Sequence, residues 1–520
     1  MKQGTNLLVI DNGTQSVRAM LFDPSGTLLH RTRIPLQAYV SPRPGLAEQD
    51  PAYFWDRLCQ ACSELWVDSG LSPHSVAGVS LTTQRATMIA LDACGAPLRP
   101  AVVWLDQRKA ARVPSIGPLW SLLFRILGLS RTVAWFQARA VDNWMACHEP
   151  GLWERTHKFL FLSGYLLYRL TGSFVDSTAS QVGYVPFDPR KLDWAGPGDW
   201  RWRALQVRPE QLPCLHPPGR QLGEISSLAA EKTGIPPGTP VIAAASDKAC
   251  ETLGAGCTRP ETGCLGYGTT ATINVTSPEY VEPYRFIPPY PAAIPGSYTL
   301  EVQNFRGYWL VSWFKKEFGY REEELAALAG TSPEELLNEM LDRTPPGGLG
   351  LIAQPTWTPG VRIPGPEAKG AIIGFGDVHT RAHVYRAIIE GLAFALRQGQ
   401  EQLQHRTGTP IRKLVVSGGG SRSDRVMQLT ADVFGLPASR PDIAESSGLG
   451  AAIDAAVGTG LHPDFPSAVR AMTRTGRTFE PDRSTHDLYD RLFQRVYVPM
   501  YARLKPLYQE IQRITGYPEP

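Results

Sequence analysis

The sequence predicts an α/β protein of two large domains, and three observations support this fold class. Short apolar strands each run into a turn rich in Gly, Thr or Ser. The order strand, turn and strand occurs twice, about 250 residues apart, and helical segments separate the strands. The chain has 520 residues, and we place the domain boundary near 248–256, which gives domains over 1–250 and 251–520.

The first strand and turn open the chain. Residues 6–10, NLLVI, have the composition of a buried strand, and 17–22 predict a second strand after the polar turn 11–16. Two strands around such a turn form a β-hairpin. An amphipathic helix is predicted over 53–66 and another strand over 76–82. This mixture of elements excludes a plain helical bundle.

The second half of the chain repeats the opening arrangement. Strand 264–267 runs into Gly268-Thr269-Thr270 and leaves as strand 271–275. A third turn, 417–421, is rich in glycine, follows a short apolar strand and leads into a predicted helix over 424–433. The third turn therefore joins a strand to a helix.

Composition indicates a soluble globular protein, because 43% of the residues are hydrophobic and 19% are charged. The net charge is +3 without a basic stripe, so nucleic acid is not an expected partner. Of eight cysteines, Cys59 and Cys62 form a C-x-x-C inside the predicted helix 53–66, which favours buried, reduced thiols. His379 and His383 have no acidic partner pattern, so we interpret them as helix-surface or capping residues.

No segment predicts insertion into a membrane. The N-terminus has no signal-peptide pattern. The most apolar stretch, 118–130, is too short to cross a bilayer and contains Arg125. We expect a helix packed on the protein, no membrane partner and a cytoplasmic location, although a surface-lying helix or a partner site stays open.

The turns have the chemistry that phosphate groups require. Glycine lets backbone N–H groups approach a phosphate, and Ser or Thr hydroxyls add donors. The turns 11–16 and 266–270 meet this need, and Asp11 at a strand end is suited to hold Mg²⁺, directly or through water. Each turn alone is weak evidence, because a D-x-G-T turn is more often a structural hairpin and the Gly-rich turn 417–421 could be a helix entry. The sequence contains no P-loop, protein-kinase, G-x-S-x-G or H-E-x-x-H motif.

Further polar residues follow predicted strands. Asp247 comes after the apolar strand 241–245, where a carboxylate could accept a proton from an attacking hydroxyl or cap the following helix. Gln84-Arg85 follows strand 76–82, and Trp104, Asp106 and Arg108 follow a strand at 101–103. Aromatic rings pack on the C–H faces of sugars while charged groups bind hydroxyls, although a core Trp beside a surface ion pair would look the same.

Taken in order, these motifs resemble the FGGY carbohydrate kinases, the family of glycerol kinase and xylulokinase. The resemblance covers about residues 7–475. It rests on DNGTQSVRAMLFD, LTTQRATMIALD with VVWLDQRKA, FLSGYLLYRLTGSFVDSTASQVGYVPFD, GTPVIAAASDKACETLGAG, CLGYGTTATI, GAIIGFGDVHTRAHVYRAIIEGLAFAL and VVSGGGSRSDRVMQLTADVFG.

The resemblance implies a duplicated, actin-like and ribonuclease-H-like fold with the active site in the cleft between two domains. It implies phosphorylation of a sugar by ATP and Mg²⁺, with Asp247 as the general base and Asp11 organising the metal. Residues implied to bind the sugar are Gln84, Arg85, Trp104, Asp106 and Arg108. Residues implied to bind ATP are Gly13, Thr14, Gln15, Gly268, Thr269, Gly419, Gly420, and Ser423 or Asp424.

Departures from the family pattern bear on the substrate. Ala86 stands where glycerol kinases usually have an acid after the Gln-Arg pair, and xylulokinases usually read Q-M-H-G there. The W-x-D-x-R at 104–108 is xylulokinase-like, and the 112–143 stretch is longer than in either prototype. We expect a ketopentose such as D-xylulose, with ribulose, erythritol, glycerol or another polyol as alternatives. The resemblance also implies a possible homodimer, which is common in the family. Two non-catalytic functions remain as alternatives: an actin-like nucleotide-binding module and a sugar-sensing pseudokinase.

Overall fold

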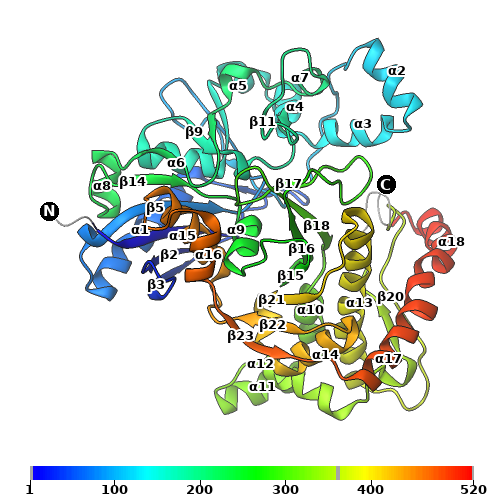
Figure 1. Cartoon of the computed structure of the whole chain (residues 1–520). Coiled ribbons are helices and arrows are strands. Elements are labelled where there is room, and N and C mark those ends of the chain that lie inside the picture. Colours follow the sequence, from blue (N-terminus) through cyan, green and yellow to red (C-terminus); the bar gives the residue numbers. More distant parts are fainter. Residues whose placement is uncertain (1–3, 359–363, 518–520) are drawn as a thin grey trace.

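The computed structural model describes residues 4–358 and 364–517 and has two lobes, each built on a mixed β-sheet (Figure 1). The sheet of the first lobe has six strands in the order β13-β14-β5-β1-β2-β3. Its strands are β1 (Asn6–Asn12), β2 (Ser16–Phe22), β3 (Leu28–Pro35), β5 (Val76–Thr83), β13 (Gln221–Glu224) and β14 (Pro240–Ala243). The predicted strands at 6–10, 17–22 and 76–82 are therefore confirmed.

Helices cover both faces of this first sheet. One face carries α1 (Pro51–Ser69), α6 (Leu162–Thr171) and α8 (Ser227–Thr233), and the other carries α9 (Asp247–Gly254), α15 (Ser446–Gly458) and α16 (Phe465–Met472). Side chains alternate along a strand, so Leu8 and Ile10 pack in the first core whereas Leu7 and Val9 pack in the second. Helices α15 and α16 come late in the chain yet lie on the first lobe (Figure 1).

The second lobe repeats this topology. Its seven-stranded sheet has the order β17-β18-β16-β15-β21-β22-β23. The strands are β15 (Thr262–Tyr267), β16 (Ala271–Ser277), β17 (Tyr290–Pro291), β18 (Tyr298–Asn304), β21 (Lys413–Ser417), β22 (Ala438–Pro441) and β23 (Thr475–Phe479). In both sheets a run of antiparallel strands is followed by two parallel pairings and then one antiparallel pairing. The antiparallel run has three strands in the first sheet and four in the second, where β17 is the additional edge strand. The fold is thus duplicated, as the resemblance implied.

One continuous hydrophobic core supports the second lobe. It includes side chains from α10 (Trp309–Phe318), α13 (Arg381–Thr407), α14 (Asp424–Phe434) and α17 (Arg483–Leu492), and α18 (Val498–Thr515) follows at the C-terminal end of the described chain. His383 lies in the capping box at the start of α13. Its ring Nδ1 accepts the Thr380 backbone N–H at 3.2 Å, and the Thr380 side chain accepts the backbone N–H of His383. The capping interpretation of His383 is therefore confirmed.

A smaller sheet is built from an insertion that follows β5 and from one short strand, at 48–49, that precedes β5. Its order is β4-β7-β6-β8, with β4 (Glu48–Gln49), β6 (Met88–Leu91), β7 (Ala101–Val102) and β8 (Lys158–Phe161). Helices α2 (Pro118–Ile126), α3 (Ser130–Arg139) and α4 (Val141–His148) lie in the same insertion. This insertion holds the segments predicted to meet the sugar.

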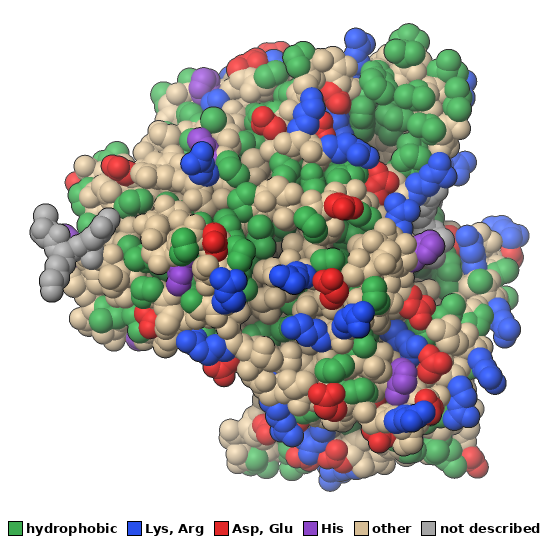
Figure 2. Space-filling model, viewed as in Figure 1, with side chains coloured by type: hydrophobic (Ala, Val, Ile, Leu, Met, Phe, Trp, Pro, Cys, Tyr) green, Lys and Arg blue, Asp and Glu red, His purple; other side chains and the backbone are tan. Residues whose placement is uncertain are grey.

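Helix α2 packs on the protein less fully than its sequence predicts. Phe124 is buried against Trp200, with ring centroids 5.1 Å apart, but Leu119 and Ile126 are each 74% exposed. The apolar face of α2 forms a green patch at the top right of the space-filling view (Figure 2). In the part of the chain that the structure describes, no helix is long and apolar enough to cross a membrane.

The cysteines match the sequence interpretation in part. All eight are free thiols. Cys62 is buried and Cys59 half-buried in α1, and burial raises the pKa of Cys59 to about 12. Cys94 and Cys214, in contrast, are exposed. A reactive low-pKa thiol at the C-x-x-C is therefore excluded.

Candidate active site

The first hairpin places Asp11 inside the protein at the end of β1. The Gly13 N–H donates to the Ser16 carbonyl at 3.1 Å and closes the turn. Asp11 is 3% exposed, and its carboxylate lies 3.4 Å from the Arg18 guanidinium. Burial raises the pKa of Asp11 from 3.8 to about 7, against the attraction of Arg18, and the nearby Asp247 raises it further. Two catalytic candidates far apart in sequence are thus electrostatic neighbours.

The turn residue Thr14 connects the first hairpin with the predicted sugar segment. Its hydroxyl donates to Gln84 Oε1 at 3.0 Å and accepts from the Trp104 indole N–H at 3.0 Å. Trp104 remains 40% exposed, so its ring is accessible. The Gln84 N–H also donates to the Asn12 carbonyl at 3.0 Å. Three residues predicted for two different ligands therefore form one cluster.

Several buried polar atoms of this cluster have no partner among the described residues. They are both amide atoms of Asn12, the Nε2 of Gln84 and the hydroxyl of Thr87. Buried polar groups are almost always hydrogen-bonded in proteins, and a group without a partner usually marks a bound ligand or water. These atoms lie where strands β1 and β5 end. This end of the first sheet is therefore a candidate site for a hydroxyl-rich ligand.

Asp247 is the first residue of α9, and its geometry bears on both predicted roles, the proton acceptor and the helix cap. Its carboxylate accepts the Lys248 N–H at 2.8 Å, so it bonds to the first turn of the helix, although Ser246 occupies the cap position. Burial raises the pKa of Asp247, while Arg85 and then Lys248 oppose that effect. The side chain keeps partial contact with solvent. The raised pKa makes this carboxylate a stronger base than an exposed aspartate, which suits it to accept a proton.

Arg85 lies where the two lobes meet. Its guanidinium donates to both carboxylate oxygens of Glu301 on β18, at 3.0 and 3.2 Å, and stacks on the Tyr290 ring at 4.6 Å. Glu301 and Tyr290 belong to the second sheet, whereas Arg85 follows β5 of the first. The next residue, Ala86, has a φ of 58°, a left-handed conformation that is unusual for a residue with a Cβ and is often found at functional sites.

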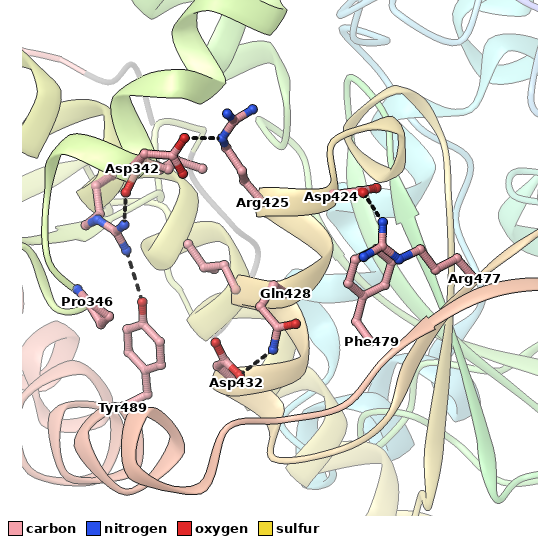
Figure 3. Close-up of a pocket in the computed structure, with 12 residues that line it drawn as sticks. Asp342, Pro346, Asp424, Arg425, Gln428, Asp432, Arg477, Phe479 and Tyr489 are labelled. Atoms are coloured by element: carbon pink, nitrogen blue, oxygen red, sulfur yellow. Dashed lines mark hydrogen bonds and ion pairs between the residues drawn. The ribbon is translucent and has the colours of Figure 1, made fainter.

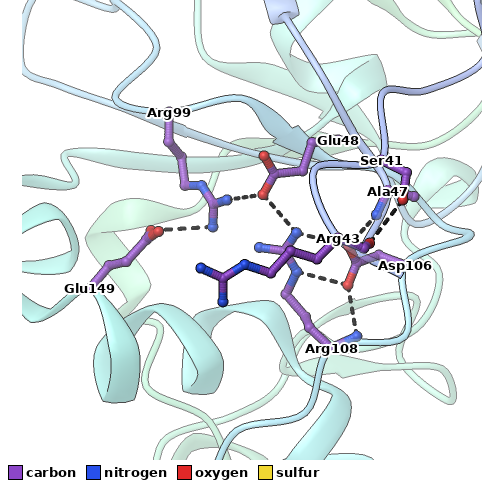
Figure 4. A network of polar contacts seen from close by, with 8 residues as sticks. All are labelled: Ser41, Arg43, Ala47, Glu48, Arg99, Asp106, Arg108 and Glu149. Carbon is purple, nitrogen blue, oxygen red and sulfur yellow. Dashed lines mark hydrogen bonds and ion pairs between the residues drawn. The ribbon is translucent and has the colours of Figure 1, made fainter. Parts of the chain in front are cut away.

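Asp106 and Arg108 face each other in a buried network (Figure 4). Asp106 accepts the Ala47 N–H at 2.7 Å, the Arg108 N–H at 2.8 Å, and two guanidinium bonds from Arg108 at 2.7 and 2.8 Å. Arg108 also donates to Glu48 at 2.7 Å and stacks on Trp144 at 4.4 Å. Both carboxylate oxygens of Asp106 are engaged, so this pair fixes the loop that carries Trp104. Direct contact of the pair with a sugar stays a prediction.

The second hairpin and the third turn lie side by side. Gly268 accepts the Tyr308 N–H at 2.9 Å, and Thr269 is exposed at the tip. Gly418 has a φ of +86° and contacts the backbone of Tyr267, while a Cβ on Gly420 would lie 2.4 Å from the Tyr308 ring. These close approaches require glycine. They bring the two predicted nucleotide turns, about 150 residues apart in sequence, together in space.

Helix α14 begins just after the third turn, and its cap residue Ser423 and its first residue Asp424 have different contacts. The Ser423 hydroxyl accepts the Val426 N–H at 3.4 Å and caps the helix. Asp424 forms ion pairs with Arg440 and Arg477 at the rim of a hollow of about 380 Å³ that runs along α14 (Figure 3). Asp424 is the single predicted site residue in the lining of this hollow. The hollow belongs to the second lobe and contains neither Asp11 nor Asp247.

The residues around Asp11 fit Mg²⁺ held mostly by a nucleotide. Among the described residues no group of three or more His, Cys, Asp or Glu side chains could hold a metal by itself. Mg²⁺ in phosphate-transfer sites usually takes one or two carboxylates, with phosphate oxygens and waters as the other ligands. The pKa of Asp11 is raised by burial and by several acids, so a cation beside it would favour its charged form.

Several charged residues at the site escaped the sequence interpretation. Arg18 and Arg31 both pair with Glu445, which precedes α15. Lys248 pairs with Glu251 within α9 at 2.6 Å. Nothing in the local sequence pattern links Glu445 with the first hairpin, because the contact spans 427 positions of the chain. Lys248 and Glu251 are adjacent to the Asp247 motif and were detectable as neighbours three residues apart on one helix face.

The repeated lobes and their paired glycine turns define a duplicated α/β protein of the actin-like, ribonuclease-H-like class. Residues 6–254 match the N-terminal domain of the FGGY family of carbohydrate kinases, and residues 264–459 match its C-terminal domain. The chain therefore belongs to the FGGY family of carbohydrate kinases. Its members are phosphotransferases that act on a sugar and use ATP as the phosphoryl donor.

Individual relatives cover nearly the whole chain. The uncharacterized sugar kinase YgcE of Escherichia coli K12 is 30% identical over 492 residues, 94% of this chain and 92% of that protein. An autoinducer-2 kinase of the same strain is 29% identical over 498 residues, 93% of this chain and 92% of that protein. The crystal structure of xylulose kinase from Rhodospirillum rubrum is 28% identical, with a TM-score of 0.81, and the match covers 97% of this chain and all of that one.

Proposed function

We propose that this chain transfers the γ-phosphoryl group of ATP to a hydroxyl of a ketopentose such as D-xylulose, with Asp247 as the general base. The observation that carries the proposal is the position of Asp247. It lies at the start of α9, in the field of Arg85 and beside Asp11, within reach of solvent. A base of this kind accelerates a reaction when its pKa lies near the working pH.

The mechanism assigns one action to each part of the site. Asp247 accepts the proton of the sugar hydroxyl while that oxygen bonds to the γ-phosphorus and the bond to the bridging oxygen of ADP breaks. Backbone N–H groups of the turns at Gly13 and Gly268 offset charge on the phosphate oxygens. Asp11 would hold Mg²⁺, which supplies further neutralisation of phosphate charge when bound.

The sugar contacts follow from the cluster around Thr14. Trp104 offers an accessible ring face. The Nε2 of Gln84 and both amide atoms of Asn12, which have no partner among the described residues, offer donors and an acceptor for hydroxyls. Ala86 supplies no carboxylate next to Arg85, which favours a ketose over glycerol. The similarity to a xylulose kinase structure supports a ketopentose, and the similarity to an autoinducer-2 kinase places that compound in the test panel.

The test is ADP release from MgATP with D-xylulose, L-xylulose, D-ribulose, L-ribulose, erythritol, glycerol and autoinducer-2. We expect one ketopentose to raise ADP release well above the rate without sugar. Stimulation by glycerol or autoinducer-2 alone would reject the ketopentose and keep the kinase. ATP hydrolysis that no panel compound changes would count against sugar phosphorylation by this site.

A further inference from the structure

Lys248, the residue after Asp247, has a side chain that the mechanism above leaves unused. Its ammonium donates to Glu251 at 2.6 Å, and the two side chains are only 23% and 13% exposed. An ammonium group carries three donors. In the described parts of the chain Glu251 is the single hydrogen-bond acceptor of the Lys248 ammonium, so two of its donors remain for a ligand.

The ammonium of Lys248 lies against the strand that leads into the second hairpin. A Cβ atom on Gly266 would be 3.1 Å from the Lys248 Nζ and 3.6 Å from a carboxylate oxygen of Glu251. Gly266 is on β15, two residues before Gly268. The same Cβ would lie 2.7 Å from the Thr272 hydroxyl, so a side chain at Gly266 would crowd both that hydroxyl and the ammonium.

Glu251 has a second partner that fixes its own position. Its other carboxylate oxygen accepts the hydroxyl of Ser417, the last residue of β21, directly before Gly418. Burial alone would raise the pKa of Glu251, but Lys248 and Ser417 outweigh it and lower the pKa. The charged pair thus joins the helix of Asp247 to both turns predicted to bind nucleotide.

An ordinary salt bridge within a helix is the simplest alternative. Such pairs on an exposed surface add a few tenths of a kcal/mol and need no partner outside the helix. The Lys248–Glu251 pair differs, because Ser417 of the second lobe shares the carboxylate and the ammonium lies against Gly266. Helix stability explains neither contact.

We propose that Lys248 is a second catalytic residue, whose ammonium contacts the γ-phosphate oxygens of bound ATP, and that Glu251 is the residue that positions it. This proposal rests on the proposed function, since it takes ATP as the ligand. Lys248 transfers no proton in this step. Its fixed positive charge offsets the negative charge on the γ-phosphate oxygens as Asp247 takes the proton of the sugar hydroxyl.

The kinetic test compares Lys248→Met, Lys248→Arg and the control Lys232→Met, which removes an exposed lysine on α8. Removing one group that stabilises transition-state charge lowers kcat by roughly 10²–10³-fold. We expect that loss in Lys248→Met with the sugar KM unchanged, and partial recovery in Lys248→Arg. A kcat for Lys248→Met within about threefold of the control would overturn the proposal.

The binding test needs no turnover and separates this proposal from the proposed function. Calorimetry without sugar gives the Kd values of MgATP and MgADP for each variant. We expect Lys248→Met to weaken MgATP more than MgADP, because only ATP carries the γ-phosphate. Glu251→Gln should show the same loss of preference, and its thermal midpoint shows separately how much the lost ion pair destabilises the fold. An equal shift for both nucleotides would reject the γ-phosphate contact, even if the wild-type chain proved to phosphorylate no compound of the panel.

Discussion

Replacing Arg85 with Met tests whether the contact between the lobes is a buried ion pair. The guanidinium makes two bonds to Glu301, whose side chain is 2% exposed, while the Arg85 side chain is 18% exposed. Burial alone would lower the pKa of Arg85, and Glu301 outweighs that effect and raises it. Arg85→Met leaves the Glu301 carboxylate buried without a partner, which costs about 3–5 kcal/mol of unfolding free energy.

The double variant Arg85→Met with Glu301→Leu is the matched control. Replacing both members of a buried pair by apolar side chains is often neutral, so most of the lost stability should return. Urea unfolding followed by fluorescence measures the three free energies. A loss below about 1 kcal/mol in the single variant, the range of exposed pairs, would refute the buried-pair interpretation.

Three further variants test separate parts of the site. Asp11→Asn should stabilise the fold at pH 8. The pKa of Asp11 in the folded wild type is raised to about 7, so the wild type loses stability as pH rises through that value, whereas asparagine does not titrate. Thermal midpoints at pH 5 and pH 8 should therefore differ less in the variant than in the wild type. Trp104→Phe keeps the ring but removes the bond to Thr14, and the sugar KM should rise roughly 2- to 12-fold. Asp106→Asn should destabilise the chain by about 1.5–3 kcal/mol, since it removes the bidentate charged bonds to Arg108 while Glu48 still pairs with that guanidinium. A raised sugar KM at unchanged stability would instead place Asp106 on the sugar.

Strands and turns could be predicted from the sequence because their signals are local. The run NLLVI and the Gly-Thr turn after it lie within a few residues of each other, and β1 forms there. Apolar composition does not state what a helix packs against, however. For that reason α2 was expected on the protein surface as a packed helix, whereas Leu119 and Ile126 face solvent.

Site residues could be predicted from the sequence where they lie at the ends of strands and within motifs that follow the family's order. Asp11 lies near the end of the buried strand β1 and Asp247 comes after the buried strand β14, and the fold brings them close enough for Asp247 to raise the pKa of Asp11. Long-range ion pairs were not predictable, because Glu301 reaches Arg85 across 216 positions of the chain. Asp106 shows the related limit, since the same residue type suits a sugar contact and a loop-fixing ion pair.

The most direct test of the account compares sugar-dependent ADP release by the wild-type chain and by Asp247→Asn. Asparagine has nearly the same shape and can still accept the Lys248 N–H, so folding and MgATP binding should be unchanged. Loss of a general base lowers turnover by about 10²–10⁴-fold, and the account predicts a kcat reduction in that range with the stimulating sugar. Near-wild-type turnover by a folded Asp247→Asn protein would contradict the assignment of Asp247 as the base.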